Sequence, residues 1–74
     1  MSKNPLYANE VATAHQFIIE HNDDCEFSEF LAEIRERKDL THSDRWSLIY
    51  DYMQRSYPEA TGSIVTGLAY WLEN

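Results

Sequence analysis

The sequence predicts an all-α fold, a small bundle of about four short helices that forms one helical domain over residues 1–74. Apolar residues recur at spacings of three and four in four separate segments, which is the periodicity of amphipathic helices. Glycine and proline occur only twice each, too few for the tight turns of an all-β domain. The connections between the four patterns are short, which favours neighbouring helices in one bundle.

The first helix is expected from Asn4 and Pro5 to about His21. An Asn side chain caps free N–H groups, and the fixed φ of proline suits the first helical position. The expected core stripe is Tyr7, Val11, Ala14 and Ile18, flanked by Leu6 and Phe17 on one side and by Ala8, Ala12 and Ile19 on the other. An apolar arc of this width predicts contact with more than one neighbour.

The second helix is expected to begin at Asp24 or a few residues later, because the segment 21–24 is rich in turn and cap residues. Its core face should be Phe27, Phe30, Leu31 and Ile34, and its far side should carry Glu26, Glu29, Glu33 and Glu36. The basic residues Arg35, Arg37 and Lys38 come at its end. This order of acids and bases suits the helix dipole.

The third helix is expected from the segment 41–44, in which Thr41 followed by Asp44 resembles a capping box, to about Ser56 before Pro58. Its core stripe should be Trp46, Ile49, Tyr50, Met53 and Tyr57. Asp51 and Arg55 stand in the favourable order for an ion pair one turn apart.

The last helix is expected to start at the segment 61–63, with Ile64, Val65, Leu68, Ala69 and Leu72 as its core face and Trp71 at the border. Gly67 costs about 1 kcal/mol relative to Ala inside a helix. Its presence therefore predicts that another backbone passes close to this position.

The formal net charge is −7, and the first thirty-four residues hold seven acids against the single cation Lys3. Such a surface repels phosphate and anionic lipid and attracts basic proteins. Cys25 is the only cysteine, so an internal disulfide is impossible and a reducing compartment is favoured. The chain has neither a signal pattern nor an apolar run of roughly 18 to 20 residues. We expect a cytoplasmic protein with no membrane contact.

Motifs for catalysis or metal binding are missing from the sequence. His15, His21 and His42 have no ligand spacing, the polar segment 21–25 lacks the pattern of a zinc or EF-hand site, and there is no glycine-rich phosphate loop. We expect no enzyme activity, no cofactor and no metal.

Two surfaces are candidates for partner binding. The first is an acidic stripe made of Asp23, Asp24, Glu26, Glu29, Glu33 and Glu36. Carboxylates one helical turn apart lie about 5–6 Å from each other, close to the spacing of phosphates along a DNA strand, so the stripe could dock on a basic nucleic-acid-binding groove. The competing interpretation is a solvated helix face that aids solubility.

The second surface is a partner or dimer contact formed by Leu48, Tyr52, Arg45 and Arg55. Leu48 and Tyr52 lie one turn apart outside the core stripe, and aromatic and Arg residues are typical of contact hot spots. The competing interpretation is that the fourth helix packs on that side and covers them. These residues, the broad arc of the first helix and Gly67 together predict a symmetric homodimer.

The sequence predicts a small acidic protein-binding module that regulates or inhibits a partner with a basic, possibly nucleic-acid-binding, surface. Its size, acidity and lack of catalytic motifs resemble those of small accessory proteins encoded by phages and plasmids. The alternative is a helix-turn-helix-like DNA-binding transcriptional regulator that uses Arg35, Arg37, Lys38 and Arg45. A pI of about 4.7 disfavours direct nucleic-acid binding.

Overall fold

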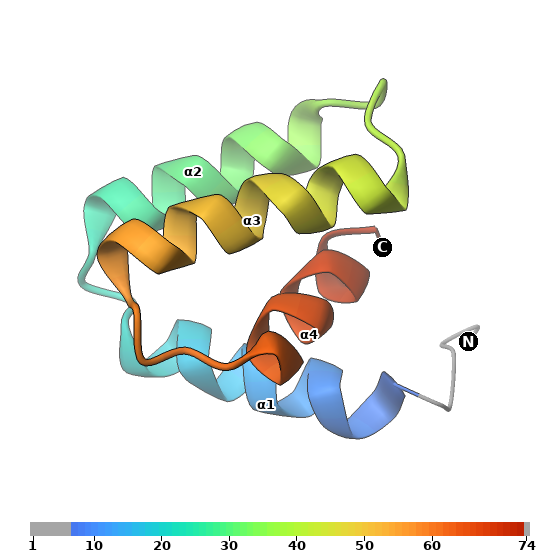
Figure 1. The fold of residues 1–74 in the computed structure, drawn as a ribbon. Coiled ribbons are helices and arrows are strands. Elements are labelled where there is room, and N and C mark those ends of the chain that lie inside the picture. The colour runs from blue at the N-terminus through green and yellow to red at the C-terminus, as the bar shows by residue number, and fades with distance from the viewer. Residues whose placement is uncertain (1–6, 74) are drawn as a thin grey trace.

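The computed structural model describes residues 7–73, which form four α-helices and no strand (Figure 1). The helices are α1 (Ala8–Glu20), α2 (Cys25–Glu36), α3 (His42–Ser56) and α4 (Gly62–Leu72). The predicted all-α fold of four short helices is confirmed. The expected start of the first helix at Asn4 and Pro5 lies outside the described residues.

The helix α4 lies at the centre of the arrangement. It packs most closely on α1, next on α3, and only lightly on α2. The helices α2 and α3 run side by side in opposite directions, and α1 lies on the other side of α4 from them (Figure 1). None of the helices among residues 7–73 is long and apolar enough to cross a membrane.

The core gathers around α4 because this helix touches all three others. The buried apolar residues are Ala14, Phe17, Phe27, Leu31, Ile34, Ile49, Met53, Val65, Leu68, Ala69 and Leu72. Each large side chain removed from water contributes about 1.5–3 kcal/mol. Four of the five core positions predicted for the last helix are buried, and the fifth, Ile64, is half-buried.

Gly67 lies where α4 crosses α1. A Cβ added there would lie 2.0 Å from the carbonyl oxygen of Glu10 and 2.9 Å from the Cβ of Ala14. Only glycine allows the two helices to approach so closely. The predicted close approach of another backbone is therefore confirmed, and that backbone belongs to α1.

Two of the predicted helix starts show the expected capping. The Asp24 side chain accepts a hydrogen bond of 3.1 Å from the backbone N–H of Phe27 at the start of α2. Thr41 and Asp44 form a complete capping box at the start of α3. Further along α3, Asp51 and Arg55 form the predicted ion pair, with 2.8 Å between nitrogen and oxygen.

The core face of α1 differs from the prediction. Phe17, placed on the flank, is buried, whereas Val11 and Ile18 of the predicted stripe are only half-buried. The reason is the crossing at Gly67, which brings the side of α1 that carries Glu10 and Ala14 against α4. Because residues spaced by three and four share a helix face, Phe17 lies on that side.

Tyr50 is a second correction, because it was predicted to lie in the core and is 42% exposed. Its ring stacks on the outer side of Trp46, with 5.1 Å between centroids. The Trp46 indole N–H donates to the Thr66 hydroxyl at 3.1 Å and so closes this part of the core. Tyr50 is left outside the covered face.

Candidate protein-binding groove

A groove lies along α2 on the side of α3, and we call it the acidic groove. Its lining residues are Glu26, Glu29, Phe30, Ala32, Glu33 and Glu36 of α2 and Tyr52 of α3. Its volume is about 470 Å³. The four glutamates are exposed because Phe27, Leu31 and Ile34 turn the opposite face of α2 into the core.

The apolar part of the acidic groove is formed by Phe30 and Tyr52. Their rings stack with 4.2 Å between centroids and an angle of 14° between planes, and both side chains are half-buried. Burial raises the pKa of the Tyr52 hydroxyl, and the nearby charge of Asp24 acts in the same direction. The groove therefore has uncharged aromatic rings beside four carboxylates.

The glutamates of the acidic groove form no close ion pair within residues 7–73, although the charge of Glu33 contributes to the raised pKa of Arg37. The ion pairs within residues 7–73 are Arg37–Asp39, His42–Glu73, Arg45–Glu73 and Arg55–Asp51. None of them includes Glu26, Glu29, Glu33 or Glu36. Like charges one turn apart repel each other and create a negative potential along the helix, which a cationic partner would relieve.

Asp24 has a structural role instead of lining the groove. One carboxylate oxygen caps α2, and the other accepts a hydrogen bond from the Tyr57 hydroxyl. That hydroxyl, together with the Phe27 N–H, lowers the pKa of Asp24, and the carboxylate raises the pKa of Tyr57 to about 12. Asp23 is exposed in the turn before the cap.

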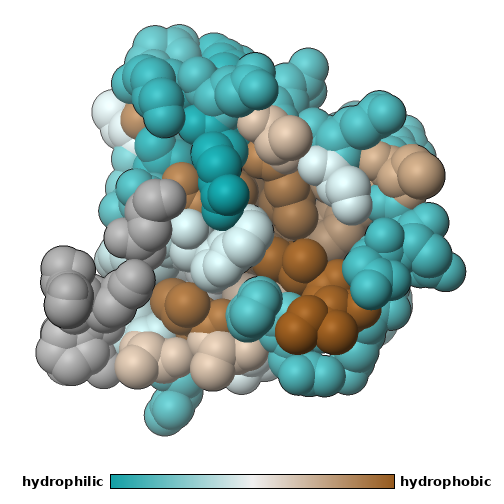
Figure 2. Space-filling model, turned by 180° about the vertical axis from the view of Figure 1, so that it is seen from behind, coloured by the Kyte–Doolittle hydropathy of each residue, from teal (hydrophilic) through white to brown (hydrophobic). Residues whose placement is uncertain are grey.

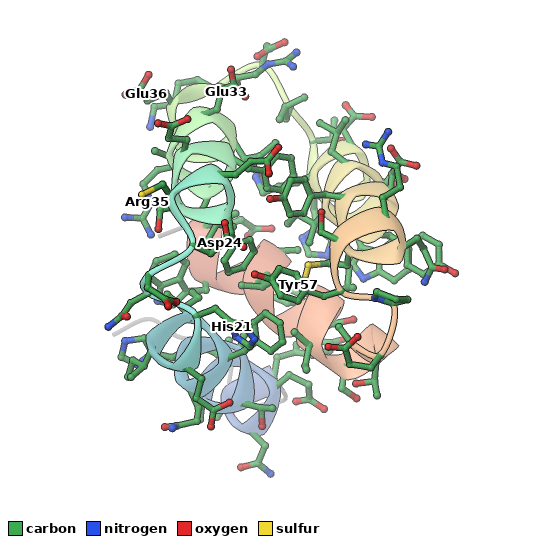
Figure 3. The ribbon with its side chains drawn as sticks, turned by 90° about the vertical axis from the view of Figure 1, so that its left-hand side faces the viewer. His21, Asp24, Glu33, Arg35, Glu36 and Tyr57 are labelled. Atoms are coloured by element: carbon green, nitrogen blue, oxygen red, sulfur yellow. The ribbon has the colours of Figure 1, made fainter. Side chains whose placement is uncertain are left out.

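His21 completes this corner of the molecule. Its ring lies 4.1 Å from that of Phe17 and 4.7 Å from that of Tyr57, and its Nδ1 is 2.8 Å from the Phe17 carbonyl oxygen. Figure 3 shows His21, Asp24 and Tyr57 gathered where α1, α2 and α3 meet. Glu33 and Glu36 lie at the far end of α2 (Figure 3). The predicted acidic stripe is thus divided between a structural corner and the groove.

The four residues of the second predicted surface differ in burial and in their contacts. Tyr52 is covered on one side by Phe30, which belongs to α2 and not to the fourth helix that the alternative named. Arg45 is largely buried, donates to the Leu40 carbonyl at 3.1 Å and pairs with Glu73. Arg55 pairs with Asp51. Leu48 alone is left as an apolar side chain facing solvent, 37% exposed.

No group of three or more His, Cys, Asp and Glu side chains in the described part of the chain is arranged to hold a metal ion. In the polar segment 21–25, His21 and Asp24 have the structural partners described above, and Cys25 is an exposed free thiol. The segment connects α1 to α2.

Phe30 and Ala32 are lining residues of the groove that the sequence patterns did not assign to it. The apolar periodicity of α2 includes Phe30 and therefore predicts that it lies on the core face. Its position in sequence next to Glu29, one turn from both Glu26 and Glu33, was the signal that it borders the acidic face. Pairing with Tyr52 depends on the packing of α2 and α3 and has no sequence signal.

These features define a four-helix α protein with a negatively charged, aromatic groove. Neither a protein-family model, nor a curated protein, nor a solved structure matches this chain.

Proposed function

We propose that this protein is a small acidic protein-binding module whose acidic groove docks on a basic surface of a partner and so regulates or inhibits that partner. The observation that carries the proposal is the set of four unpaired glutamates beside the stacked rings of Phe30 and Tyr52. A basic surface that binds nucleic acid is the kind of target that fits. Carboxylates about 5–6 Å apart along α2 are spaced much as strand phosphates are.

The aromatic rings favour a protein partner over a simple counter-ion. Arg and Lys side chains are attracted to the faces of Tyr and Phe rings, and their carbon stems add apolar contact. Partly exposed aromatic residues are also common at the centre of binding hot spots. A segment rich in Arg or Lys would satisfy the carboxylates and cover the rings at the same time.

Two observations weigh against the alternative of direct DNA binding through a helix-turn-helix. The helices α2 and α3 run side by side and antiparallel, whereas the two helices of that motif cross steeply (Figure 1). In addition, Arg37 and Arg45 are already paired with Asp39 and Glu73. Two of the four cations that this alternative uses are therefore partly neutralised, which weakens phosphate contacts.

Charge reversal in the groove tests the proposal. The variant Glu29→Lys with Glu33→Lys should weaken binding to an arginine-rich peptide by at least about tenfold, mostly through slower association, and the loss should shrink at high salt. The control Glu20→Lys with Glu59→Lys changes the net charge equally at exposed sites outside the groove. An equal loss in both variants would mean that net charge alone drives binding, and would contradict the proposal.

A competition experiment tests the regulatory part. A basic DNA-binding protein captured from the native host should be released from its DNA when this protein is added. The groove variant should release it only at much higher concentration. Simultaneous binding of DNA and this protein to the same basic surface would rule out inhibition by phosphate mimicry.

A further inference from the structure

A second groove flanks α2 on the side away from α3, and we call it the apolar groove. Three helices line it with Ile18 of α1, Leu31 and Ala32 of α2, and Trp71 and Leu72 of α4, around a volume of about 290 Å³. Figure 2, which views the molecule from behind, shows white and brown surface across the middle and lower right of that face, with teal surface above it and to its right. Ile18 and Trp71 are only half-buried, so the groove presents apolar side chains to solvent.

The exposed part of α1 extends this face. The helix α1 packs most closely on α4, and Phe17 on its inner side also contacts Phe27 of α2 and Tyr57 just after α3. Ile19, next to Ile18, is 49% exposed and Ala12 is exposed as well. These side chains extend the apolar surface beside the groove, and exposed apolar residues that gather in a patch are common at protein contacts.

The rim of the apolar groove carries one cation and one anion, Arg35 and Glu36. The Arg35 guanidinium lies 4.3 Å from the centroid of the Trp71 ring, on the side of α2 that faces away from α3 (Figure 3). Neither Arg35 nor Glu36 forms an ion pair within residues 7–73. They cannot easily pair with each other, because consecutive helix residues point in different directions.

A rim with one unpaired charge of each sign is complementary to itself. In a two-fold dimer every contact occurs twice, so Arg35 of each copy can face Glu36 of the other. A basic partner would be repelled by Arg35 and an acidic one by Glu36, whereas a second copy satisfies both. The stacked Trp71 ring holds the guanidinium near the groove and lowers the entropy cost of such a pair.

We propose that a second copy of this chain covers the apolar groove, with Ile18, Ile19 and Trp71 of both copies at the centre and reciprocal Arg35 and Glu36 pairs at the rim. A standard contact buries about 800 Å² on each partner, roughly a sixth of the 4787 Å² that this chain exposes. Ala32 and Glu36 line both grooves, whereas Glu26, Glu29 and Glu33 line the acidic groove alone, so variants at Glu29 and Glu33 test the function proposed above separately from the dimer.

The position of this contact differs from the one suggested by sequence patterns. The close helix approach permitted by Gly67 is used inside the chain between α1 and α4. Tyr52 is occupied by Phe30. Of the three reasons for expecting a dimer, the broad apolar arc of α1 is the one whose exposed residue, Ile19, follows directly on a lining residue of the apolar groove.

Sedimentation equilibrium from micromolar to millimolar protein tests the proposal. The expected result is a mass that rises from 8.7 kDa toward twice that value. Ile19→Lys should raise the dimer dissociation constant by at least about tenfold. The control Leu48→Lys places the same charge at a 37% exposed apolar position on α3 and should alter the constant by less than about threefold. A mass of 8.7 kDa at every concentration overturns the proposal and leaves the groove to a different protein.

A charge swap tests the reciprocal pairs. Arg35→Glu and Glu36→Arg should each weaken the dimer by about tenfold, because each places like charges opposite one another twice. The double variant should recover to within about threefold of the original. Circular dichroism at each concentration verifies that the variants keep their helices. Failure of the folded double variant to recover would exclude this arrangement of the two copies.

Discussion

The contact between α1 and α4 and the contact between α2 and α3 are built in different ways. At the first, Gly67 brings two backbones together, and a Cβ would meet the Glu10 carbonyl at 2.0 Å. At the second, the aromatic rings of Phe27, Phe30 and Tyr52 keep the helices apart. Backbone contact brings the two helices into direct contact at the crossing point, whereas contact through large side chains leaves the acidic groove open beside α2 and α3. The candidate site lies in the second, wider contact.

The comparison predicts that the backbone contact is the least tolerant of change. Gly67→Ala should lower the free energy of unfolding by more than about 3 kcal/mol, because one helix must shift to admit the new methyl group. Gly62→Ala is the matched control, since nothing lies within 4 Å of its added Cβ. Urea unfolding followed by circular dichroism measures both, and similar losses in the two variants would contradict the role given to Gly67.

The aromatic contact between α2 and α3 should lose less free energy of unfolding when one hydroxyl group is removed from it. Tyr57→Phe keeps the ring against Phe17 and Phe27 but removes the hydroxyl that donates to Asp24. We expect a loss of about 1 kcal/mol in the free energy of unfolding. Tyr50→Phe, whose ring is 42% exposed, is the control and should have almost no effect. Equal effects would show that the bond to Asp24 contributes nothing.

The same pair predicts how stability depends on pH. The pKa of Asp24 lies below its ordinary value of 3.8 in the folded protein, so its contribution is present above that value and is lost as the pH falls through the folded pKa. The pKa of Tyr57 rises from 10.0 to about 12, so its contribution is present below pH 10 and is lost as the pH climbs toward 12. Tyr57→Phe should flatten both ends of the stability curve, and an unchanged curve would oppose this assignment.

The smallest effect on stability is expected at the groove itself. Glu29→Lys with Glu33→Lys should change the free energy of unfolding by less than about 0.5 kcal/mol, because both side chains are exposed and removing like-charge repulsion offsets other losses. The same denaturation experiment measures it. A large loss would mean that these carboxylates stabilise the fold and would remove the distinction between the groove and the core.

Much of the fold could be predicted because its signals are local. Asp24 and the pair Thr41 and Asp44 mark helix starts through hydrogen bonds that span only three residues. The core face of α4 followed from the spacing of its apolar residues. Gly67 indicated a close contact because a glycine inside a helix has a cost that needs a reason.

The candidate site could be predicted only in part. The exposed glutamates of α2 followed from helical periodicity, since their positions lie opposite Phe27, Leu31 and Ile34. The aromatic rings beside them depend on which helix lies next to α2. Periodicity describes one helix at a time and carries no information on the identity of its neighbour.

The sequence by itself determined where the helices lie, which faces are apolar and where the negative charge gathers, because these properties depend on residues a few positions apart. Only the tertiary structure decided that α1 turns Phe17 inward, that Tyr50 faces solvent and that Tyr57 reaches Asp24 across 33 positions of the chain. When the apolar arc of a helix is wider than the surface of one neighbouring helix, several rotations of the helix about its axis bury almost the same apolar area. Packing against α4 at Gly67 selects one of them, and the two grooves beside α2 are the spaces that this choice leaves open.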